Sequence, residues 1–350
     1  MDEYSLSPDC LVSEIGEQQL LQRLYRFCPA HLVGDDAAVL PTRGDRHLVV
    51  TSDMLVDGTH FSLGLANPAI RTTSPADAGW RAAAANLSDL AAMGADPLGI
   101  TVSLGLPSET PVRWLDELYE GMTECLNCYH TPILGGDLCR SPILTLSITA
   151  LGEVLPDRQI LRSAARPGDA IVATGLHGAS RAGLELLLHP EWGQDWSEET
   201  RQNFKRAHQR PTPRLDVPPL LRQIDPTVRV AGMDSSDGLA DAVLQICRAS
   251  GVGACLWQEC LPVPDAFGTV LSAQDRLDWV LYGGEDFELV LCLPEAIARQ
   301  LVRQLGGKAA LIGEIATDPQ VVLKDASGSQ PDLKLSLDRG FQHFGDRPAG

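Results

Sequence analysis

The sequence predicts an α/β or α+β fold in two domains. Its 350 residues exceed what one typical domain needs, and each half is long enough to form its own hydrophobic core. Strand-like runs alternate with helical runs along the chain, an alternation typical of this fold class. A loop at residues 155–169 separates the halves, so we place the domains at residues 1–155 and 156–350.

The first half begins with a strand-like run at residues 47–52, which is β-branched and apolar and ends next to Asp53. An alanine-rich run at residues 78–93 predicts a helix with one apolar face. Gly94 is a suitable residue to end this helix. Asn86 and Asp89, three residues apart, share another flank of this helix. The other predicted elements of this half are a helix at 111–129 and a strand at 142–154.

The second half repeats the alternation. A buried strand opens it at residues 170–174, where four apolar residues precede a threonine. The remaining predicted elements are strands at 228–233 and 287–293, helices at 239–249 and 295–305, and short strands from Leu311 onward around a turn at Ala326-Ser327-Gly328.

Composition excludes several classes of function. A net charge of −18 disfavours a general nucleic-acid binder, which needs a basic surface to meet the phosphate backbone. The first residues lack the basic and apolar regions of a signal peptide, and the apolar stretches are too short to cross a membrane. Nine cysteines at low density indicate reduced thiols and a cytoplasmic location. Cys125 and Cys128 have zinc-like spacing but no second pair, so we predict no metal-thiolate site.

Carboxylates recur beside glycine or after apolar runs, and no lysine stands with them. These acidic segments are residues 34–36, 51–53, 86–89, 135–137, 234–238 and 283–286, whereas all four lysines lie in the second part of the chain. A site assembled from such segments would be strongly anionic, and it would attract hard divalent cations that carry phosphates with them. The pattern therefore indicates phosphoryl chemistry that depends on metal ions.

Each segment alone has a plainer explanation. Ser236 or Asp237 could simply cap the following helix, although one cap does not explain two acids at one turn. Gly135-Gly136-Asp137 could be an exposed glycine turn, or its glycines could let backbone N–H groups approach a phosphate while Asp137 holds a cation. His60 could be a structural histidine. The chain also lacks a lysine-bearing phosphate loop, a dinucleotide fingerprint and the protein-kinase signatures.

In their order, these segments resemble the thiamine-monophosphate kinase family, in the superfamily of aminoimidazole ribonucleotide synthetase and selenophosphate synthetase. The matching segments are residues 34–39, 51–56, 60–61, 86–95, 135–137, 162–169, 210–214, 233–239, 283–289 and 340–344. The resemblance implies Mg²⁺-dependent, direct in-line transfer of the γ-phosphoryl group of ATP to thiamine monophosphate, giving thiamine diphosphate. It also implies a homodimer in which the N-terminal mixed sheets form a shared β-barrel, with a C-terminal α/β domain alongside.

The resemblance assigns roles to individual residues and implies no covalent nucleophile on the protein. The residues implied to hold several Mg²⁺ ions are Asp36, Thr51, Ser52, Asp53, Asp89, Asp137, Asp234 and Asp237. Those implied to contact ATP are Tyr119, Gly136, Asp137, Arg162 and Ser236. Those implied to line the thiamine-phosphate pocket are His60, Glu285 and Phe341.

Some features depart from the family pattern. The turn at residues 175–180 lacks the usual aspartate, and Leu138-Cys139 stands where hydroxyl residues are usual. Two alternatives remain open from the sequence. The chain could be a non-catalytic sensor that binds thiamine phosphates and ATP, or another ATP-dependent enzyme of the superfamily. It lacks the reactive N-terminal cysteine and lysine of a selenophosphate synthetase and the C-terminal cysteine of a hydrogenase-maturation protein.

Overall fold

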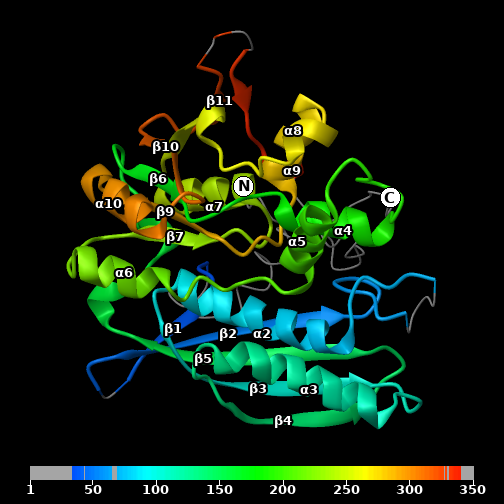
Figure 1. Cartoon of the computed structure of the whole chain (residues 1–350). Helices are drawn as coiled ribbons and strands as arrows, with labels where there is room; N and C mark the ends of the chain where they lie inside the picture. The colour runs from blue at the N-terminus through cyan, green and yellow to red at the C-terminus, as the bar shows by residue number, and fades with distance from the viewer. Residues whose placement is uncertain (1–33, 43, 65–68, 327, 329–330, 340–350) are drawn as a thin grey trace, which may run out of the picture.

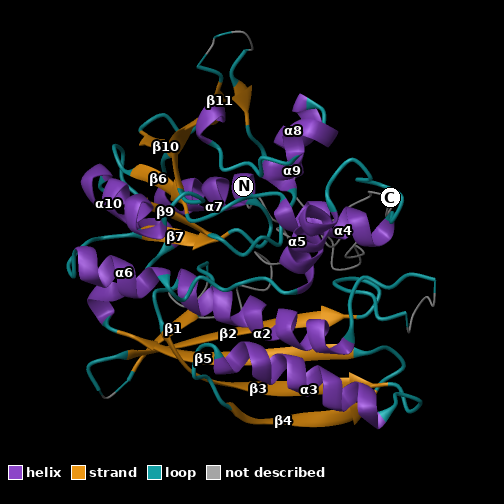
Figure 2. Cartoon of the chain, viewed as in Figure 1, coloured by secondary structure: helices purple, strands orange, loops and turns teal. Residues whose placement is uncertain are grey.

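The computed structural model describes residues 34–42, 44–64, 69–326, 328 and 331–339. These residues form two α/β halves, each with one mixed β-sheet, and helix α2 lies between the halves (Figure 1). Figure 2 shows the same arrangement with its helices and strands distinguished. The predicted two-domain, mixed α/β architecture is confirmed.

The N-terminal half is a five-stranded sheet with two helices on one face (Figure 1). Its elements are β1 (Ala38–Pro41), β2 (His47–Val56), α2 (Pro75–Ala92), β3 (Asp96–Leu106), α3 (Val112–Asn127), β4 (Ile133–Arg140) and β5 (Thr145–Val154). The strand order is β1-β2-β5-β3-β4, and β3 and β4 are the parallel pair. In the described part of the chain this sheet is open, with β1 and β4 at its edges.

The C-terminal half contains a seven-stranded sheet in the order β12-β11-β8-β10-β6-β9-β7. Its strands are β6 (Ala170–Ala173), β7 (Ala231–Asp234), β8 (Gly253–Trp257), β9 (Leu289–Leu293), β10 (Ala310–Ala316), β11 (Val321–Lys324) and β12 (Leu333–Lys334). Its helices are α4 (Ala179–Leu188), α5 (Glu198–Gln209), α6 (Val217–Ile224), α7 (Leu239–Ser250), α8 (Phe267–Val270), α9 (Ala273–Tyr282) and α10 (Glu295–Leu305). Short 3-10 turns occur at η1 (Pro156–Arg158), η2 (Arg162–Ala164), η3 (Gln258–Cys260) and η4 (Leu337–Arg339).

Helix α2 is more deeply buried than the sequence predicts. Ser74 caps it, with its hydroxyl accepting a hydrogen bond from the backbone N–H of Asp77 at 3.1 Å. The single apolar face expected for this helix is wrong, because its residues are buried on nearly all sides by the N-terminal sheet, by α3 and by β7. Small residues permit this packing: a Cβ at Gly79 would lie 1.9 Å from the carbonyl oxygen of Leu118 on α3.

The glycine pair at residues 135–136 lies inside strand β4, so the exposed glycine turn left open by the sequence does not form. Gly136 permits the pairing of β4 with β3, because a Cβ at this position would lie 1.8 Å from the carbonyl oxygen of Val102 on β3. Strand β3 has no counterpart among the predicted elements. Its glycines and proline weaken the β-branched signal on which strand prediction depends.

No helix among the described residues lies on the face of the N-terminal sheet opposite α2 and α3 (Figure 1). Cross-strand register places Met54, Ser147, Ser103 and Asp137 in one row across this face. Met54 is 58% exposed there. We call this surface the open face; the described part of the chain puts no layer over it. Among the described residues, no helix is long and apolar enough to cross a membrane.

Candidate functional site

Three predicted aspartates from distant segments converge between the two halves of the molecule. Asp36 precedes β1, Asp89 lies on α2, and Asp234 ends β7. Each offers a carboxylate oxygen, and these three oxygens lie within 4.8 Å of one another. We call these residues the acidic cluster. Since Asp234 comes from the C-terminal sheet and the other two from the N-terminal half, only the packed pair of domains creates this site.

Hydroxyl groups from both halves orient the acidic cluster. Asp234 is 1% exposed, and it accepts hydrogen bonds from the hydroxyls of Ser88 at 2.7 Å and Ser236 at 2.8 Å. The Thr51 hydroxyl on β2 donates to Asp89 at 2.5 Å. These contacts fix two carboxylates in orientations that keep their negative charges close together.

Strand alternation divides the β2 segment between two faces. Thr51 and Asp53 lie on the face toward α2, where the Asp53 backbone N–H donates to the side-chain oxygen of Asn86 at 3.3 Å. Ser52 lies on the open face, and its hydroxyl donates to the carbonyl oxygen of Ile148 at 3.0 Å. A strand sends successive side chains to opposite faces, so Asp53 lies near the acidic cluster and the Ser52 side chain lies away from it.

Burial and mutual repulsion make these carboxylates difficult to ionise. Burial raises the pKa of Asp53 to about 6, and the charge of Asp36 contributes. Burial likewise raises the pKa of Asp234 to about 6, again with a contribution from Asp36. The pKa of Asp89 is raised well above its ordinary value by burial and by the charges of Asp53, Asp234 and Asp36. The site therefore holds more negative charge than its surroundings neutralise.

Arg162 supplies positive charge at one side of the acidic cluster. Its guanidinium forms an ion pair with Asp36 at 3.0 Å, and its backbone N–H donates to the Asp35 carboxylate at 2.7 Å. The negative charges of Asp36, Asp234 and Asp35 raise the pKa of Arg162, so it remains charged. Within the described part of the chain, the ion pair with Arg162 balances one of these carboxylates and leaves an excess of negative charge.

The donor set fits magnesium. Mg²⁺ prefers oxygen ligands and usually binds through a few carboxylates, water and phosphate oxygens. The acidic cluster offers oxygens from three carboxylates, with Asp53 and the Thr51 hydroxyl beside them. Thiolate and imidazole ligands are absent from this described set, which disfavours zinc. A hard divalent cation would neutralise the charge that otherwise raises the pKa values of these acids.

Glu285 lies next to the turn at residues 234–238, and His60 is the other predicted residue within its electrostatic reach. The Glu285 carboxylate forms an ion pair with Arg81 and lies 3.6 Å from Nδ1 of His208. Burial opposes ionisation of Glu285, but Arg81, His208 and His60 lower its pKa below the ordinary value. His60 therefore lies within electrostatic reach of Glu285, while its Nδ1 accepts a hydrogen bond from the Val56 backbone at 3.1 Å. Phe341 lies outside the described residues.

The remaining predicted residues lie apart from the acidic cluster or at its rim. Asp137 is exposed on the open face, in the row of Met54, so the sheet separates it from Asp53. Gly136 is beside it on β4. Tyr119 packs at the edge of the N-terminal core on α3. Asp237 is exposed at the turn before α7.

Residues that touch the predicted ones, but to which the sequence assigned no site role, include Asp35, Arg81, Asn86 and Ser88. Asn86 and Ser88 stand in the same short segment as Asp89, and the presence of polar residues in a largely apolar helix was a usable signal. Arg81 is the single basic residue of α2 and is 2% exposed. A charged residue in an alanine-rich helix indicates a specific partner, because isolated buried charges are costly.

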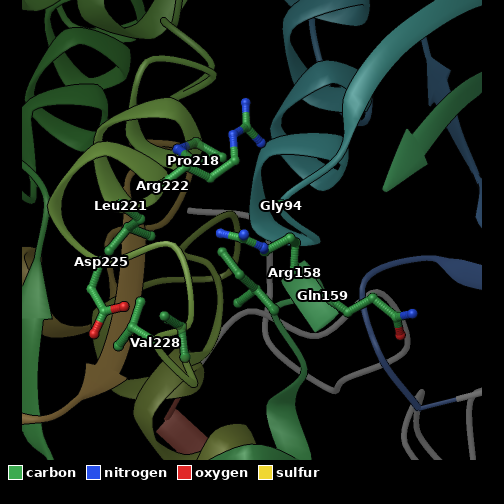
Figure 3. Close-up of a pocket in the computed structure, with 10 residues that line it drawn as sticks. Gly94, Arg158, Gln159, Pro218, Leu221, Arg222, Asp225 and Val228 are labelled. Carbon is green, nitrogen blue, oxygen red and sulfur yellow. The ribbon is translucent and has the colours of Figure 1, made fainter. Parts of the chain in front are cut away.

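A pocket elsewhere in the molecule does not coincide with this site. It lies between the C-terminal end of α2, η1 and α6, and Figure 3 shows Arg158, Leu221, Arg222 and Asp225 around it. Its lining contains none of the predicted site residues. Leucine, isoleucine, valine and proline side chains contribute much of its wall, and Arg222 already forms an ion pair with Asp96 at 3.0 Å.

Family models cover both halves of the chain. Residues 34–154 match the N-terminal domain of AIR synthase related proteins, and residues 166–326 match the C-terminal domain. The solved structure of AaThiL complexed with AMPPCP and TMP is similar to this chain with a TM-score of 0.79 and 27% identity, covering 94% of this chain and 99% of that one. The chain is an AIR synthase related protein.

Sequence relatives narrow the assignment. The chain is 55% identical over 340 residues to the thiamine-monophosphate kinase of Synechococcus elongatus, covering 96% of this chain and 98% of that protein. It is 34% identical over 315 residues to the thiamine-monophosphate kinase of Escherichia coli, covering 89% and 91%. The chain therefore belongs to the thiamine-monophosphate kinase family, and the predicted resemblance is confirmed.

Proposed function

We propose that this chain transfers the γ-phosphoryl group of ATP to thiamine monophosphate in the presence of Mg²⁺. The observation that carries the proposal is the convergence of carboxylates from both domains, with too little positive charge among the described residues to balance them. ATP and thiamine monophosphate are both polyanions, so a site that unites them needs cations between them. The structure of a relative with AMPPCP and TMP bound gives further support.

The bond changes are those of a direct displacement. A phosphate oxygen of thiamine monophosphate forms a bond to the γ-phosphorus of ATP, and the bond from that phosphorus to the β–γ bridging oxygen breaks. Thiamine diphosphate and ADP leave, and no protein nucleophile is required. The acceptor oxygen is already anionic, so it needs little help from a general base. Bound Mg²⁺ would stabilise the charge that spreads over the phosphoryl oxygens.

The residues of the chain position this reaction. The proposed Mg²⁺ ligands of the acidic site are Asp36, Thr51, Asp53, Asp89 and Asp234, with Ser52 through its backbone and Asp237 at the rim. Arg162 and Ser236 both touch this site and would contact the phosphates of ATP. His60 and Glu285 would face the thiamine part of the acceptor. Phe341 and Tyr119 keep their proposed roles toward acceptor and nucleotide.

We also propose a homodimer built through the open face and the edge strand β4. Among the described residues no layer covers this face, and Met54 exposes an apolar side chain there, whose burial against a second subunit would be favourable. Within one chain the sheet separates Asp137 from the acidic cluster. Asp137 and Gly136 would then contribute to the nucleotide site through the dimer, with the two sheets joined as a shared barrel. Light scattering on the purified protein tests this, and a monomeric mass at assay concentrations would contradict it.

The domain boundaries at 1–155 and 156–350 also stay proposals. The matches over residues 34–154 and 166–326 and the two separate sheets support them. We also propose a cytoplasmic location, because the low density of cysteines indicates reduced thiols.

Steady-state turnover tests the function directly. Purified protein with Mg²⁺, ATP and thiamine monophosphate should form thiamine diphosphate and ADP in equal amounts, and EDTA should abolish both products. Thiamine itself serves as the matched acceptor that lacks the phosphate. A folded protein that binds ATP and thiamine monophosphate without product would favour the sensor alternative.

A further inference from the structure

Arg81 is a charged side chain enclosed almost completely by the protein. It projects from α2, a helix otherwise dominated by alanine and other small residues, and its side chain is 3% exposed. A buried guanidinium is tolerated when carboxylates and carbonyl oxygens engage its N–H groups. Both of the groups that Arg81 engages belong to the other half of the molecule.

The partners of Arg81 are the Glu285 carboxylate and the backbone carbonyl of His208 on α5. Nη2 of Arg81 contacts Oε1 of Glu285, and Nη1 donates to the His208 carbonyl oxygen. Burial and the charge of Arg81 lower the pKa of His208 to about 3, so this imidazole is neutral near pH 7. Nδ1 of His208 lies 3.0 Å from the Ser180 hydroxyl. Arg81 is therefore the cation that neutralises the charge of the Glu285 carboxylate within the protein.

The backbone around Glu285 is held in an unusual conformation. Glu285 has a φ of +60° and Phe287 a φ of +52°, values that residues other than glycine rarely adopt. The Glu285 N–H donates to the Ser236 carbonyl oxygen at 2.6 Å. The neighbouring Asp286 carboxylate accepts from the backbone N–H groups of Gly178 at 2.6 Å and Ser180 at 2.8 Å. A segment in this strained conformation persists because contacts with several surrounding residues hold its backbone in place.

We propose that Arg81 is a positioning residue for the acceptor: it holds the Glu285 carboxylate in the direction that meets the thiamine part of thiamine monophosphate. The Glu285 side chain is 35% exposed and that of Arg81 only 3%, so a ligand can contact the carboxylate but not the guanidinium. Arg81 engages Oε1, and Oε2 is 3.6 Å from His208, which leaves Oε2 for the acceptor. The thiazolium ring of the acceptor is a cation, and an ionised carboxylate complements its charge. The inference rests on the proposed function.

The test separates acceptor binding from the chemical step. Arg81→Gln should raise the KM for thiamine monophosphate about tenfold, because a misdirected carboxylate loses its contact with the acceptor. The KM for ATP and kcat should stay within about threefold of the wild-type values. Arg81→Lys should recover part of the loss, since lysine keeps the charge but lacks the planar fork that meets two oxygens. Arg222→Gln, which removes another interdomain ion pair, is the matched control and should leave both KM values unchanged.

A double-mutant cycle distinguishes positioning from a general loss of structure. Glu285→Gln should raise the KM for thiamine monophosphate, and Arg81→Lys should add little in that background, because both act through one contact. If Arg81→Gln fails to fold, this cycle still tests the positioning role, because it needs only Arg81→Lys, Glu285→Gln and the double variant. Additive effects on KM, or equal effects on the KM for ATP, would overturn the inference and leave the proposed function standing. An inactive wild-type protein would instead remove the proposed function and this inference with it.

Discussion

The boundary between the two domains has two regions that differ in how carboxylate charge is neutralised. In the first, the acidic cluster, Asp36, Asp89 and Asp234 face one another. In the second, each carboxylate meets at least one arginine. These ion pairs, which we call the arginine seam, are Arg81–Glu285, Arg210–Asp77 and Arg222–Asp96. Arginines thus neutralise the carboxylates of the arginine seam, whereas the carboxylates of the acidic cluster remain in excess.

The difference shows how to separate structural charges from charges that await a ligand. In the arginine seam each carboxylate has a protein cation, so the contact is complete without any bound ion. In the acidic cluster burial and mutual repulsion raise the pKa of Asp53 and Asp234 to about 6. Such an arrangement lowers the stability of the ligand-free protein, and a cation from solution removes the penalty.

The largest expected effect comes from Asp89→Asn. Turnover should fall at least about a thousandfold, because one proposed Mg²⁺ ligand is lost while the side-chain shape is kept. In EDTA the same variant should be more stable than the wild type, by about 1 kcal/mol, because it removes one of several repelling charges. Steady-state assays and thermal unfolding in EDTA measure the two effects.

Asp96→Asn is the matched change in the arginine seam. Asp96 receives Arg222 at 3.0 Å and Arg46 at 3.3 Å and is about half exposed. Its loss should lower stability by less than about 1 kcal/mol and leave turnover within about twofold. If both variants changed stability in the same direction, the proposed contrast between the two regions would be wrong.

The regular parts of the fold were predictable because their signals are local. Helix α10 occupies residues 295–305 as the sequence predicts, and β2 and α2 begin within a few residues of their expected positions. Strand β4 was not predictable with the same means. Its glycine pair indicates a turn when taken alone, and only the close approach of β3 explains Gly136.

The site was predictable in composition but only partly in arrangement. The acids of the cluster could be named from their segments, because aspartate after a strand or beside glycine is a local pattern. The position of Asp137 depends on the sheet face to which register assigns it, and no local pattern gives that register. Arg81 was missed because its partner, Glu285, is close only after the two domains pack.

The smallest predicted effect is a change in how stability depends on pH. In metal-free protein, acids with raised pKa values bind more protons when folded than when unfolded, between about pH 4 and pH 6 for Asp53 and Asp234. The free energy of unfolding should therefore decrease as pH rises through that window, by at most about 1.4 kcal/mol per pH unit for each group.

Thermal unfolding of the wild type between pH 4.5 and pH 7.5, in EDTA and in excess Mg²⁺, follows Asp53 and Asp234 together. The difference between wild type and Asp89→Asn isolates the contribution of Asp89, whose pKa is also raised by burial and by the neighbouring acids. Titrating groups that do not interact with Asp89 are common to both proteins and cancel in that difference. In EDTA the wild type should lose stability relative to the variant as pH rises. In Mg²⁺ the sign should reverse, because a bound cation favours the ionised carboxylates and its affinity increases as they lose protons. A difference that does not respond to Mg²⁺ would mean that the repulsion in the acidic cluster is relieved by something other than a cation.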